Sequence, residues 1–355
     1  MAVNTSMKAI ITSKRTGNKY SVYRFSEYNV DIDLETDADT FDFVIKNPNG
    51  VYSGLFSKFD PVTIMVNGKT IMKGNVDMIV YIDNDEDDYI QISGRDKCWK
   101  LIDNDALPDT IENVQPKQYI EKKCNSYGIK HSVSKASICK KLVIGCGESE
   151  ISIMNNMLLD DKQRIWYLVD TLYTGTWGVK KKSTHTFVMH TSKVGIPIET
   201  FKLSEDGTDM KSEVRVYGSN DGKFELAGSY KNKYMNKLGI IKRKVRRSYS
   251  DKASSKYTSI AKEDVRETFR DNAELTIDVR LDEKNHYMPN TVCTVVNGRC
   301  KVNATFFIRR VTYSKSPDSG SKATLIMIPT DSTFEKTWQA KGCSVTGLTK
   351  ASKAL

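Results

Sequence analysis

Basic side chains that could bind an anion gather in one stretch of the chain. Residues 231–256 contain ten Lys and Arg residues and a single acidic residue, Asp251. The densest part of this basic segment is Lys242, Arg243, Lys244, Val245, Arg246 and Arg247. Such a run could bind the phosphates of a nucleic acid, with an affinity that falls as the salt concentration rises. The other interpretation, which we favour, is a solvated loop or a face that meets an acidic neighbour.

Carboxylates are the second group of candidate catalytic side chains, but nothing selects a pair among them. Glycoside hydrolysis needs two carboxylates that face a sugar, and Asp87 with Asp88, or Asp103 with Asp105, have the required types. Carboxylates this close in sequence usually face solvent from a turn. Motifs for phosphate-binding loops, dinucleotide binding, nucleophile elbows and zinc proteases are absent from the sequence. We therefore predict no catalytic residues, no cofactor and no enzyme activity.

The cysteines and histidines predict neither a metal site nor a disulfide framework. The seven cysteines are odd in number, scattered and without a CxxC pair, and no histidine lies at zinc-ligand spacing from Cys139 and Cys146. His185 and His190 are five residues apart, so on a strand they would point to opposite faces. We expect reduced thiols, several of them in the core.

Length and hydropathy predict a globular protein of two or three domains. The chain has 355 residues, of which 39% are hydrophobic and 28% are charged, and a domain commonly takes about 100–200 residues. Apolar runs such as 165–169 are far shorter than the roughly 20 residues that cross a bilayer. The apolar residues 9–11 are too few for a signal peptide. We expect synthesis in the cytoplasm and no membrane insertion.

Charge is distributed unevenly along the chain. The net charge is +10 and the basic segment alone carries +9, so the remaining residues are nearly neutral. Residues 77–109 have ten acidic and three basic residues, a net charge of −7. Opposite charges in two parts of one chain could meet where copies of the chain contact one another.

The first hundred residues have the pattern of an antiparallel β domain that ends near Pro108. Asn67-Gly68 lies between two apolar runs and predicts a hairpin, because both central residues of a type I′ turn have positive φ. Alternating polar and apolar residues, or short apolar runs, predict strands over 31–35, 40–45, 62–66, 69–72, 76–82 and 89–93.

The middle third has a mixed pattern. A helix is predicted from Pro116 to Gly128, since proline favours the first turn of a helix and glycine the residue just past its end. A second helix is predicted over 163–173, with an apolar face that includes Ile165 and Leu172. Residues 151–159 predict another helical segment, and 177–179 with 186–189 predict a small hairpin.

Strands return after about Thr208. They are predicted over 214–218, 224–227, 275–281, 291–296, 299–302, 305–313 and 323–328. Between them, Ala261, Val265, Phe269 and Ala273 are spaced four apart, which predicts a helix over 259–273 with one apolar stripe that packs on the domain. The regular pattern ends at Pro329, and a weakly patterned tail follows.

The two strand-rich ends share a sequence pattern. Five residues of the first end have counterparts 230 residues later, four of them identical, and Pro61 has a displaced counterpart in Pro289. The recurring pairs are Val62 and Val292, Val66 and Val296, Asn67 and Asn297, Gly68 and Gly298, and Lys69 and Arg299. In each end a long strand follows, ending in Tyr81 or Tyr313. A duplicated β domain explains this economically, and the alternative is convergence, since Asn-Gly hairpins arise easily.

Two stretches of the chain carry a recognisable combination of motifs. The first is Lys73-Gly74-Asn75-Val76-Asp77 followed by Ile90-Gln91-Ile92-Ser93-Gly94-Arg95-Asp96 and then Asp103. The second consists of the helix at 261–273, the strand at 275–281, Tyr287-Met288-Pro289 and the run 306–313. The first stretch resembles the baseplate hub proteins of contractile phage tails, and the second resembles the second tube domain of the late-control-D and PBSX-type hub families. The resemblance extends over most of residues 8–330.

The resemblance implies a structural role. In such hubs two similar β-barrel domains per chain form a ring in a homotrimer, so that six barrels face the hexameric tail tube, and the other end keeps threefold symmetry for a trimeric spike. The implied partners are the tail tube protein, the spike protein and other baseplate proteins, and nucleic acid is not required. Such a protein is made in the bacterial cytoplasm and assembled into the tail baseplate of a bacteriophage virion or a phage-tail-like bacteriocin, both contractile injection systems.

We therefore predict a β-rich α+β fold with two similar antiparallel β-barrel domains separated by an α+β insert. The expected units are a first barrel over 1–110, a middle domain over 111–207, a second barrel over 208–330 and a tail over 331–355. The candidate structural or interface residues are Asn67, Gly68, Gly94, Arg95, Asp96, Lys242, Arg243, Lys244, Arg246, Arg247, Asn297 and Gly298. Gly94 would allow a tight bend, and Arg95 and Asp96 would form charge-assisted hydrogen bonds at a strand end or subunit boundary; an ordinary surface turn is the alternative.

Overall fold

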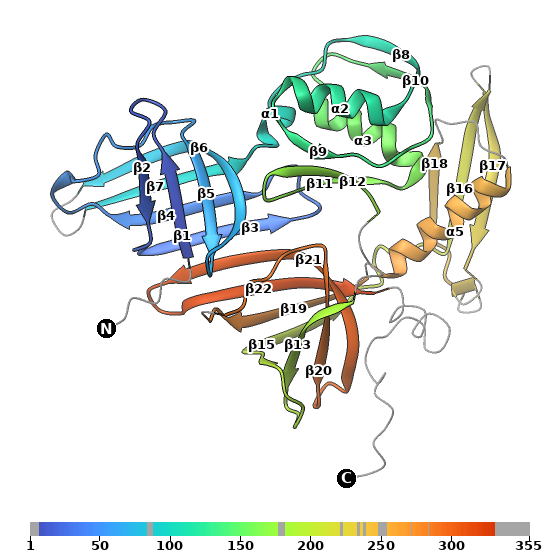
Figure 1. The fold of residues 1–355 in the computed structure, drawn as a ribbon. Helices are drawn as coiled ribbons and strands as arrows, with labels where there is room; N and C mark the ends of the chain where they lie inside the picture. Colours follow the sequence, from blue (N-terminus) through green and yellow to red (C-terminus); the bar gives the residue numbers. More distant parts are fainter. Residues whose placement is uncertain are drawn as a thin grey trace.

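A single sheet of fourteen strands dominates the fold, and three smaller sheets of two, three and three strands accompany it (Figure 1). The structure is a computed structural model that describes residues 7–83, 88–176, 182–220, 223–232, 235–236, 239–247, 254–270, 272–282 and 284–330. Strands far outnumber helices within these residues, which confirms the predicted β-rich composition. The tail over 331–355, with Cys343, lies outside the described residues.

The N-terminal half of the large sheet contains seven strands. They are β1 (Met7–Thr12), β2 (Lys19–Val22), β3 (Glu27–Asp33), β4 (Thr40–Lys46), β5 (Pro61–Val66), β6 (Lys69–Asp83) and β7 (Asp88–Asp96). Their order in the sheet is β3-β4-β7-β6-β5-β1-β2. The alternation that predicted β4 is the alternation of burial, since β4 buries Phe41, Phe43 and Ile45. No strand was predicted at β1 or β2, and the two strands expected over 69–72 and 76–82 form the single strand β6. A short 3-10 helix, η1 (Pro48–Gly50), follows β4.

The C-terminal half also contains seven strands. They are β13 (Ser183–Met189), β14 (Ile196–Pro197), β15 (Thr200–Glu205), β19 (Ala273–Arg280), β20 (Thr291–Asn297), β21 (Val302–Ser316) and β22 (Gly320–Pro329). Their order is β15-β19-β22-β21-β20-β13-β14. Four predicted strands are confirmed here. The strand expected over 299–302 is wrong, because residues 298–301 form the turn between β20 and β21.

The two halves have the same topology. Numbered along the chain within each half, the strands of both sheets run in the order 3-4-7-6-5-1-2. Both long strands also carry a bulge, between Val76 and Met78 in β6 and between Ile308 and Arg310 in β21. One strand differs in direction, since β1 is antiparallel to β5 whereas β13 is parallel to β20. The shared order supports an internal repeat over convergence of two hairpins.

The halves join edge to edge through β21 and β3. These strands pair antiparallel over six residues, with Tyr313 opposite Val30, and both side chains are fully buried. On the other face of the pair, Asp31 Oδ1 accepts hydrogen bonds from Arg310 Nε and Thr312 Oγ1, each at 2.7 Å. One hydrophobic core therefore extends through both halves.

A middle unit lies between the two halves in sequence and contacts the first one (Figure 1). It comprises α1 (Trp99–Ile102), β8 (Asp109–Val114), α2 (Pro116–Ser126), β9 (Lys130–Ser132), β10 (Cys139–Ile144), α3 (Glu150–Leu158), η2 (Leu159–Asp161), β11 (Arg164–Leu168) and β12 (Thr171–Gly175). The helix at Pro116 is confirmed, and Gly128 beyond its end has a φ of +65°. The helix expected over 151–159 is confirmed as α3.

The helix expected over 163–173 is wrong, because the segment forms the strand pair β11 and β12. Its apolar spacing suits a helix, but most of its residues are β-branched or aromatic, which favours strands. Val169 lies between the strands with a φ of +62°, a conformation that ends any helix at that point.

A small unit is inserted between β15 and β19. It contains β16 (Glu213–Asn220), β17 (Lys223–Lys231), β18 (Arg243–Arg247) and α5 (Ser254–Arg270). The predicted helix is confirmed, and Ala261 and Val265 of its apolar stripe are buried in a separate core with Val214 and Val216. Ala273 belongs to β19 because α5 ends at Arg270, and the side chain of Phe269 lies outside the described residues.

Residues 183–205 belong to the C-terminal half and not to a local hairpin. β13 pairs in parallel with β14 and β20, which corrects the hairpin predicted over 177–179 and 186–189. Residues 177–181 lie outside the described residues. A local pattern identified the strand, but its partner lies about a hundred residues away in the chain.

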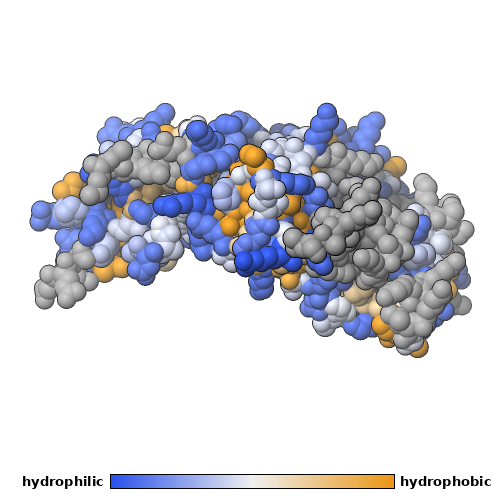
Figure 2. Space-filling view, turned by 90° about the horizontal axis from the view of Figure 1, so that it is seen from below, coloured by the Kyte–Doolittle hydropathy of each residue, from blue (hydrophilic) through white to orange (hydrophobic). Residues whose placement is uncertain are grey.

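One face of the described part is mainly hydrophilic (Figure 2). Figure 2 views the molecule from below, and apolar side chains gather in a small patch near the middle of this face, bordered by hydrophilic ones. Four cysteines (Cys98, Cys124, Cys139 and Cys293) are buried free thiols, and Cys146 and Cys300 are exposed free thiols. Within the described ranges, no helix has the length and apolar character needed to span a membrane.

Candidate functional site

Gly94, Arg95 and Asp96 lie at the end of β7, where the N-terminal half meets α1. A Cβ on Gly94 would lie 2.0 Å from the carbonyl oxygen of Asn75, so only glycine fits this close approach of two strands. Arg95 donates to both carboxylate oxygens of Asp103, at 2.9 and 2.8 Å, and its Nε donates to Asp77 at 2.7 Å. The hydrogen bonds from Arg95 lower the pKa of Asp103. Arg95 therefore connects β6 and β7 to the start of the middle unit.

Asp96 and Asp39 form a pair of buried carboxyl groups beneath this strand end. Asp96 accepts hydrogen bonds from the backbone N–H groups of Asp39, at 2.9 Å, and Cys98, at 2.7 Å. Asp39 Oδ1 accepts from the N–H of Asp33 at 2.9 Å, whereas Oδ2 is buried and finds no hydrogen-bond partner among the described residues. Burial raises the pKa of Asp96 to about 7, and burial together with the charge of Asp96 raises the pKa of Asp39. Joint ionisation of the pair is therefore unfavourable.

Asp170 is the second charged contact between the N-terminal half and the middle unit. The side chain of Asp170 is 10% exposed. Its carboxylate forms salt bridges with Lys97 Nζ at 2.6 Å, Lys130 Nζ at 3.0 Å and Lys73 Nζ at 3.2 Å. Burial alone would raise the pKa of Asp170, but the lysine hydrogen bonds outweigh it and lower the pKa to about 2. The backbone adds a hydrogen bond from Lys73 N to Val169 O at 2.8 Å. Sequence reasoning missed this cluster because its members come from four distant segments.

The two Asn-Gly turns have different geometry. Asn67 and Gly68 have φ values of 49° and 75°, as expected for a type I′ hairpin. The side chain of Asn67 reaches the C-terminal half and donates to the carbonyl oxygens of Asp282, at 2.8 Å, and Asn285. It therefore connects the two halves at a second place.

Asn297 and Gly298 open a longer turn. Asn297 ends β20, and its Oδ1 accepts from the N–H of Cys300 at 3.1 Å. Gly298 N donates to Met189 O at 3.1 Å, and a Cβ on Gly298 would lie 2.1 Å from His190 O. Glycine is needed here for a close approach to the end of β13, and not for positive φ.

Two arginines of the basic segment bind buried carboxylates of the small unit. Arg243 Nε donates to Glu213 at 2.8 Å, and hydrogen bonds from Arg243 and Arg215 lower the pKa of Glu213. Arg246 contacts Asp264 at 3.1 Å, and Asp264 is only 4% exposed. These contacts support the interpretation that we favoured, in which basic side chains meet acidic neighbours.

The remaining basic candidates lie around the same strand. Lys242 Nζ donates to the carbonyl oxygens of Gly207 and Thr208, each at 2.9 Å. Lys244 is exposed on β18. Arg247 pairs through its backbone with Tyr217, and its side chain lies outside the described residues. The basic segment therefore contains a strand of the small unit, where a solvated loop had been one expectation.

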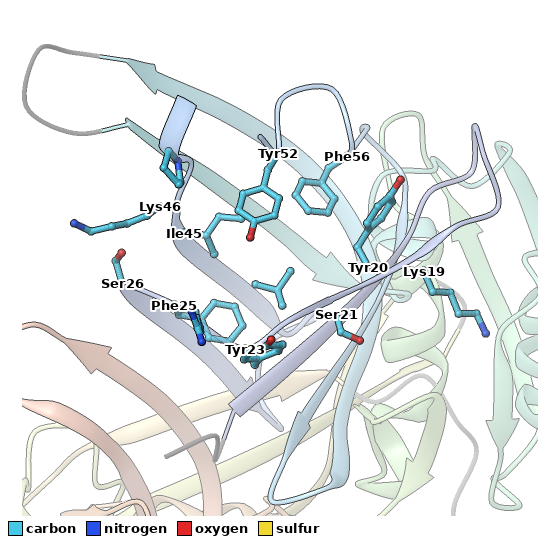
Figure 3. A pocket seen from close by; sticks show the side chains of 13 residues that line it. Lys19, Tyr20, Ser21, Tyr23, Phe25, Ser26, Ile45, Lys46, Tyr52 and Phe56 are labelled. Atoms are coloured by element: carbon cyan, nitrogen blue, oxygen red, sulfur yellow. The ribbon is translucent and has the colours of Figure 1, made fainter. Parts of the chain in front are cut away.

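A cavity of about 720 Å³ opens beside β2, at the end of the N-terminal half (Figure 3). Figure 3 shows the rings of Tyr52 and Phe56 close together on the segment after η1. Tyr20 packs edge-on against Phe56 with ring centroids 5.7 Å apart. Cationic side chains on its lining come from Lys19, Arg24 and Lys46. Sequence reasoning missed this cavity, because its lining comes from three separate segments.

Some of the candidate residues make contacts between units, and the others make contacts within one unit. Gly94, Arg95 and Asp96 lie at the junction of the N-terminal half with the middle unit, Asn67 joins the two halves, and the basic residues lie in the small unit. No group of three or more His, Cys, Asp or Glu residues in the described ranges could hold a metal ion.

A family model matches the N-terminal half. Residues 12–96, from the end of β1 to the end of β7, match the family described as Mu phage baseplate assembly protein GpP-like, N-terminal. The match confirms the resemblance to phage baseplate proteins that the sequence indicated. No curated protein matches the chain.

Solved structures of tail proteins have a similar fold. A tail protein from Neisseria meningitidis MC58 is 17% identical, with a TM-score of 0.75 over 91% of this chain and 96% of that one. The 43 kDa tail protein of prophage MuSo2 from Shewanella oneidensis is 14% identical, with a TM-score of 0.73 over 91% and 99% of the two chains. An Escherichia coli type VI secretion component, described as similar to the T4 tail proteins gp27 and gp5, is 10% identical, with a TM-score of 0.54 over 86% and 73%.

Proposed function

We propose that this chain is a structural baseplate hub of a contractile tail, in a phage or a phage-tail-like particle, and that it works as a homotrimer. The observation that carries the proposal is the repeat of one seven-stranded topology within a single chain. Three chains supply six such halves, which match a hexameric tail tube. The middle and small units occur once per chain, so they keep threefold symmetry for a trimeric spike.

In this proposal each half is a tube-type β-barrel domain. The first is built from residues 7–96. The second is built from 183–205 and 273–329, with residues 213–270 as an insertion, which moves the boundaries expected from the sequence. The pairing of β13 with β20 and of β15 with β19 supports this division. The middle domain then extends from α1 to β12.

The proposed partners are the tail tube protein, the spike protein and other baseplate proteins. The family match over residues 12–96 supports a place in a baseplate, and the E. coli type VI secretion component has the same fold. The charged contacts of Arg95 and Asp170 and the amide hydrogen bonds of Asn67 hold the units of one chain in a fixed arrangement. A rigid adaptor of this kind works through its surfaces and needs no catalytic group or cofactor.

Light scattering on the purified chain tests the proposal. We expect a particle with three times the 40.2 kDa mass of one chain, which binds a tail tube ring and a spike protein at the same time. A chain that stays monomeric at all concentrations and binds neither protein would refute it. DNA binding at low salt that is lost when exposed Lys244 becomes Ala would support the nucleic-acid alternative instead.

A further inference from the structure

The second part of β6 presents an unpaired, apolar strand edge. Residues 78–83 pair with β7 on one side only, and no described strand pairs with their other edge. Met78, Tyr81 and Ile82 are exposed, with Tyr81 at 47%. A long apolar edge with free N–H and C=O groups is a template for pairing with another strand, and folded proteins rarely leave one uncovered.

The repeat shows what covers the equivalent edge. Alignment of the two bulges places Tyr81 of β6 at the position of Tyr313 in β21. Tyr313 is fully buried, because β3 pairs with this edge and puts Val30 opposite it. The equivalent strand edge is therefore paired with a neighbouring strand in the C-terminal half and has no described partner strand in the N-terminal half.

The counterpart of β3 in the C-terminal half is β15, and it also has an open edge. In the first half a row of residues crosses four strands from Val76 through Gly94 and Phe41 to Val30. In the second half the equivalent row runs from Ile308 through Met327 and Leu275 to Leu203. Leu203 thus occupies the position of Val30. No described strand pairs with the outer edge of β15.

We propose that residues 78–83 of β6 in one copy pair antiparallel with β15 of the next copy. The register copies the pairing of β21 with β3, so that Tyr81 lies opposite Leu203, Val80 opposite Ser204, and Ile82 opposite Lys202. The seam repeats head to tail and closes a ring, in which every half joins its neighbours through one kind of strand pair. The inference rests on the proposed function for the number of copies, and it names the surface that joins them.

A charge placed on the open edge tests the seam. Ile82→Lys would put two like charges opposite each other, whereas the matched variant Ile82→Glu would put opposite charges there. Both side chains are exposed in the single chain, so folding should be unaffected, which circular dichroism checks. We expect Ile82→Lys to raise the concentration at which the oligomer half-dissociates by roughly tenfold or more. Adding Lys202→Glu to Ile82→Lys should restore assembly, and Ile82→Glu should leave it intact.

A disulfide across the seam tests the register. Val80→Cys with Ser204→Cys, in a chain whose Cys146, Cys300 and Cys343 are Ser, should form covalent links between chains, because directly opposed strand residues suit disulfide geometry. The matched control is Thr312→Cys with Asp31→Cys, the equivalent pair within one chain. It should oxidise without joining chains.

The outcomes separate the seam from the trimer. The seam would be overturned, and the hub proposal retained, by a trimer whose dissociation is unchanged by Ile82→Lys and that forms no disulfide between chains through Val80→Cys and Ser204→Cys. A link confined to single chains, or an oligomer whose edge is covered by residues 331–355 or by another protein, would also overturn it. A monomer at every concentration would overturn both proposals.

Discussion

The N-terminal and C-terminal halves share one topology but differ at the edge of their longest strand. The second part of β21 is covered by β3, and Tyr313 is fully buried. The equivalent part of β6 has no described partner on that side, and Tyr81 is 47% exposed. A strand pattern therefore fixes which residues face the core, but a neighbouring strand decides whether the edge is buried. Burial of Tyr313 is complete within one chain, whereas burial of Tyr81 would need a further strand from outside its half.

The largest expected difference between the halves is at the equivalent tyrosines, Tyr81 and Tyr313. Tyr313→Ala should lower the free energy of unfolding by about 3–5 kcal/mol, because it leaves a cavity in the core. It also removes the hydroxyl that donates to Tyr287 O at 2.5 Å and accepts from Tyr287 N at 2.7 Å. Tyr81→Ala should cost less than about 1 kcal/mol in dilute solution. Urea denaturation of both variants measures the difference.

Protein concentration sharpens this test. If β6 pairs with a second copy, the cost of Tyr81→Ala should grow as the chain becomes oligomeric, because the ring is then buried. The cost of Tyr313→Ala should not change, since its burial is complete within one chain. Equal costs for the two variants in dilute solution would show that the exposed and buried tyrosines are not in different environments.

The two Asn-Gly turns should respond differently to the same substitution. Gly68 has a φ of +75° and no atom within 4 Å of an added Cβ, and asparagine tolerates this conformation. Gly68→Asn should therefore cost at most about 1 kcal/mol. A side chain at Gly298 would meet His190 O at 2.1 Å, so Gly298→Asn should cost about 1–3 kcal/mol. The midpoints of chemical denaturation compare the two.

A similar loss at both turns would contradict this account. It would mean that both glycines serve one backbone conformation, as the identical sequence suggests. Gly68→Ala distinguishes the causes, because alanine disfavours positive φ more than asparagine does while adding less bulk. We expect Gly68→Ala to cost more than Gly68→Asn.

Much of the sheet could be predicted from local patterns, but its partners could not. Alternation identified β4 and β19, and the Asn-Gly dipeptide identified the hairpin of β5 and β6. The helix expected over 163–173 failed because Ile165 and Leu172 suit one face of a helix and also the core side of two short strands. The place of β13 beside β20 depends on a contact across a hundred residues, which no local pattern contains.

The candidate site was predictable only where its residues lie close in sequence. Gly94, Arg95 and Asp96 are consecutive, and Arg95 meets Asp103 eight residues later. The lysines around Asp170 come from β6, the residue after β7, and β9, so only the folded chain brings them together. The buried pair of Asp39 and Asp96 is likewise a product of the pairing between β4 and β7.

The smallest predicted effect is a dependence of stability on pH that arises from a buried carboxyl pair in the N-terminal half. Folded Asp96 keeps its proton up to a pKa of about 7, whereas an unfolded aspartate releases it near pH 4. Between these values the folded state binds more protons, so the free energy of unfolding should fall as pH rises from about 4 to 7. The C-terminal half has Pro329 at the equivalent position and no such carboxyl.

Asp39→Asn should make this slope shallower, because it removes a second carboxyl whose pKa is raised in the folded state by burial and by the charge of Asp96. The variant keeps the oxygen that accepts from Asp33 N, and its new amide replaces the oxygen that has no described partner. Asp103→Asn is the control, since the lowered pKa of Asp103 contributes stability that is lost only as pH falls. Urea denaturation from pH 4 to 7 compares the three chains. A slope unchanged by Asp39→Asn would place its source outside the carboxyl pair.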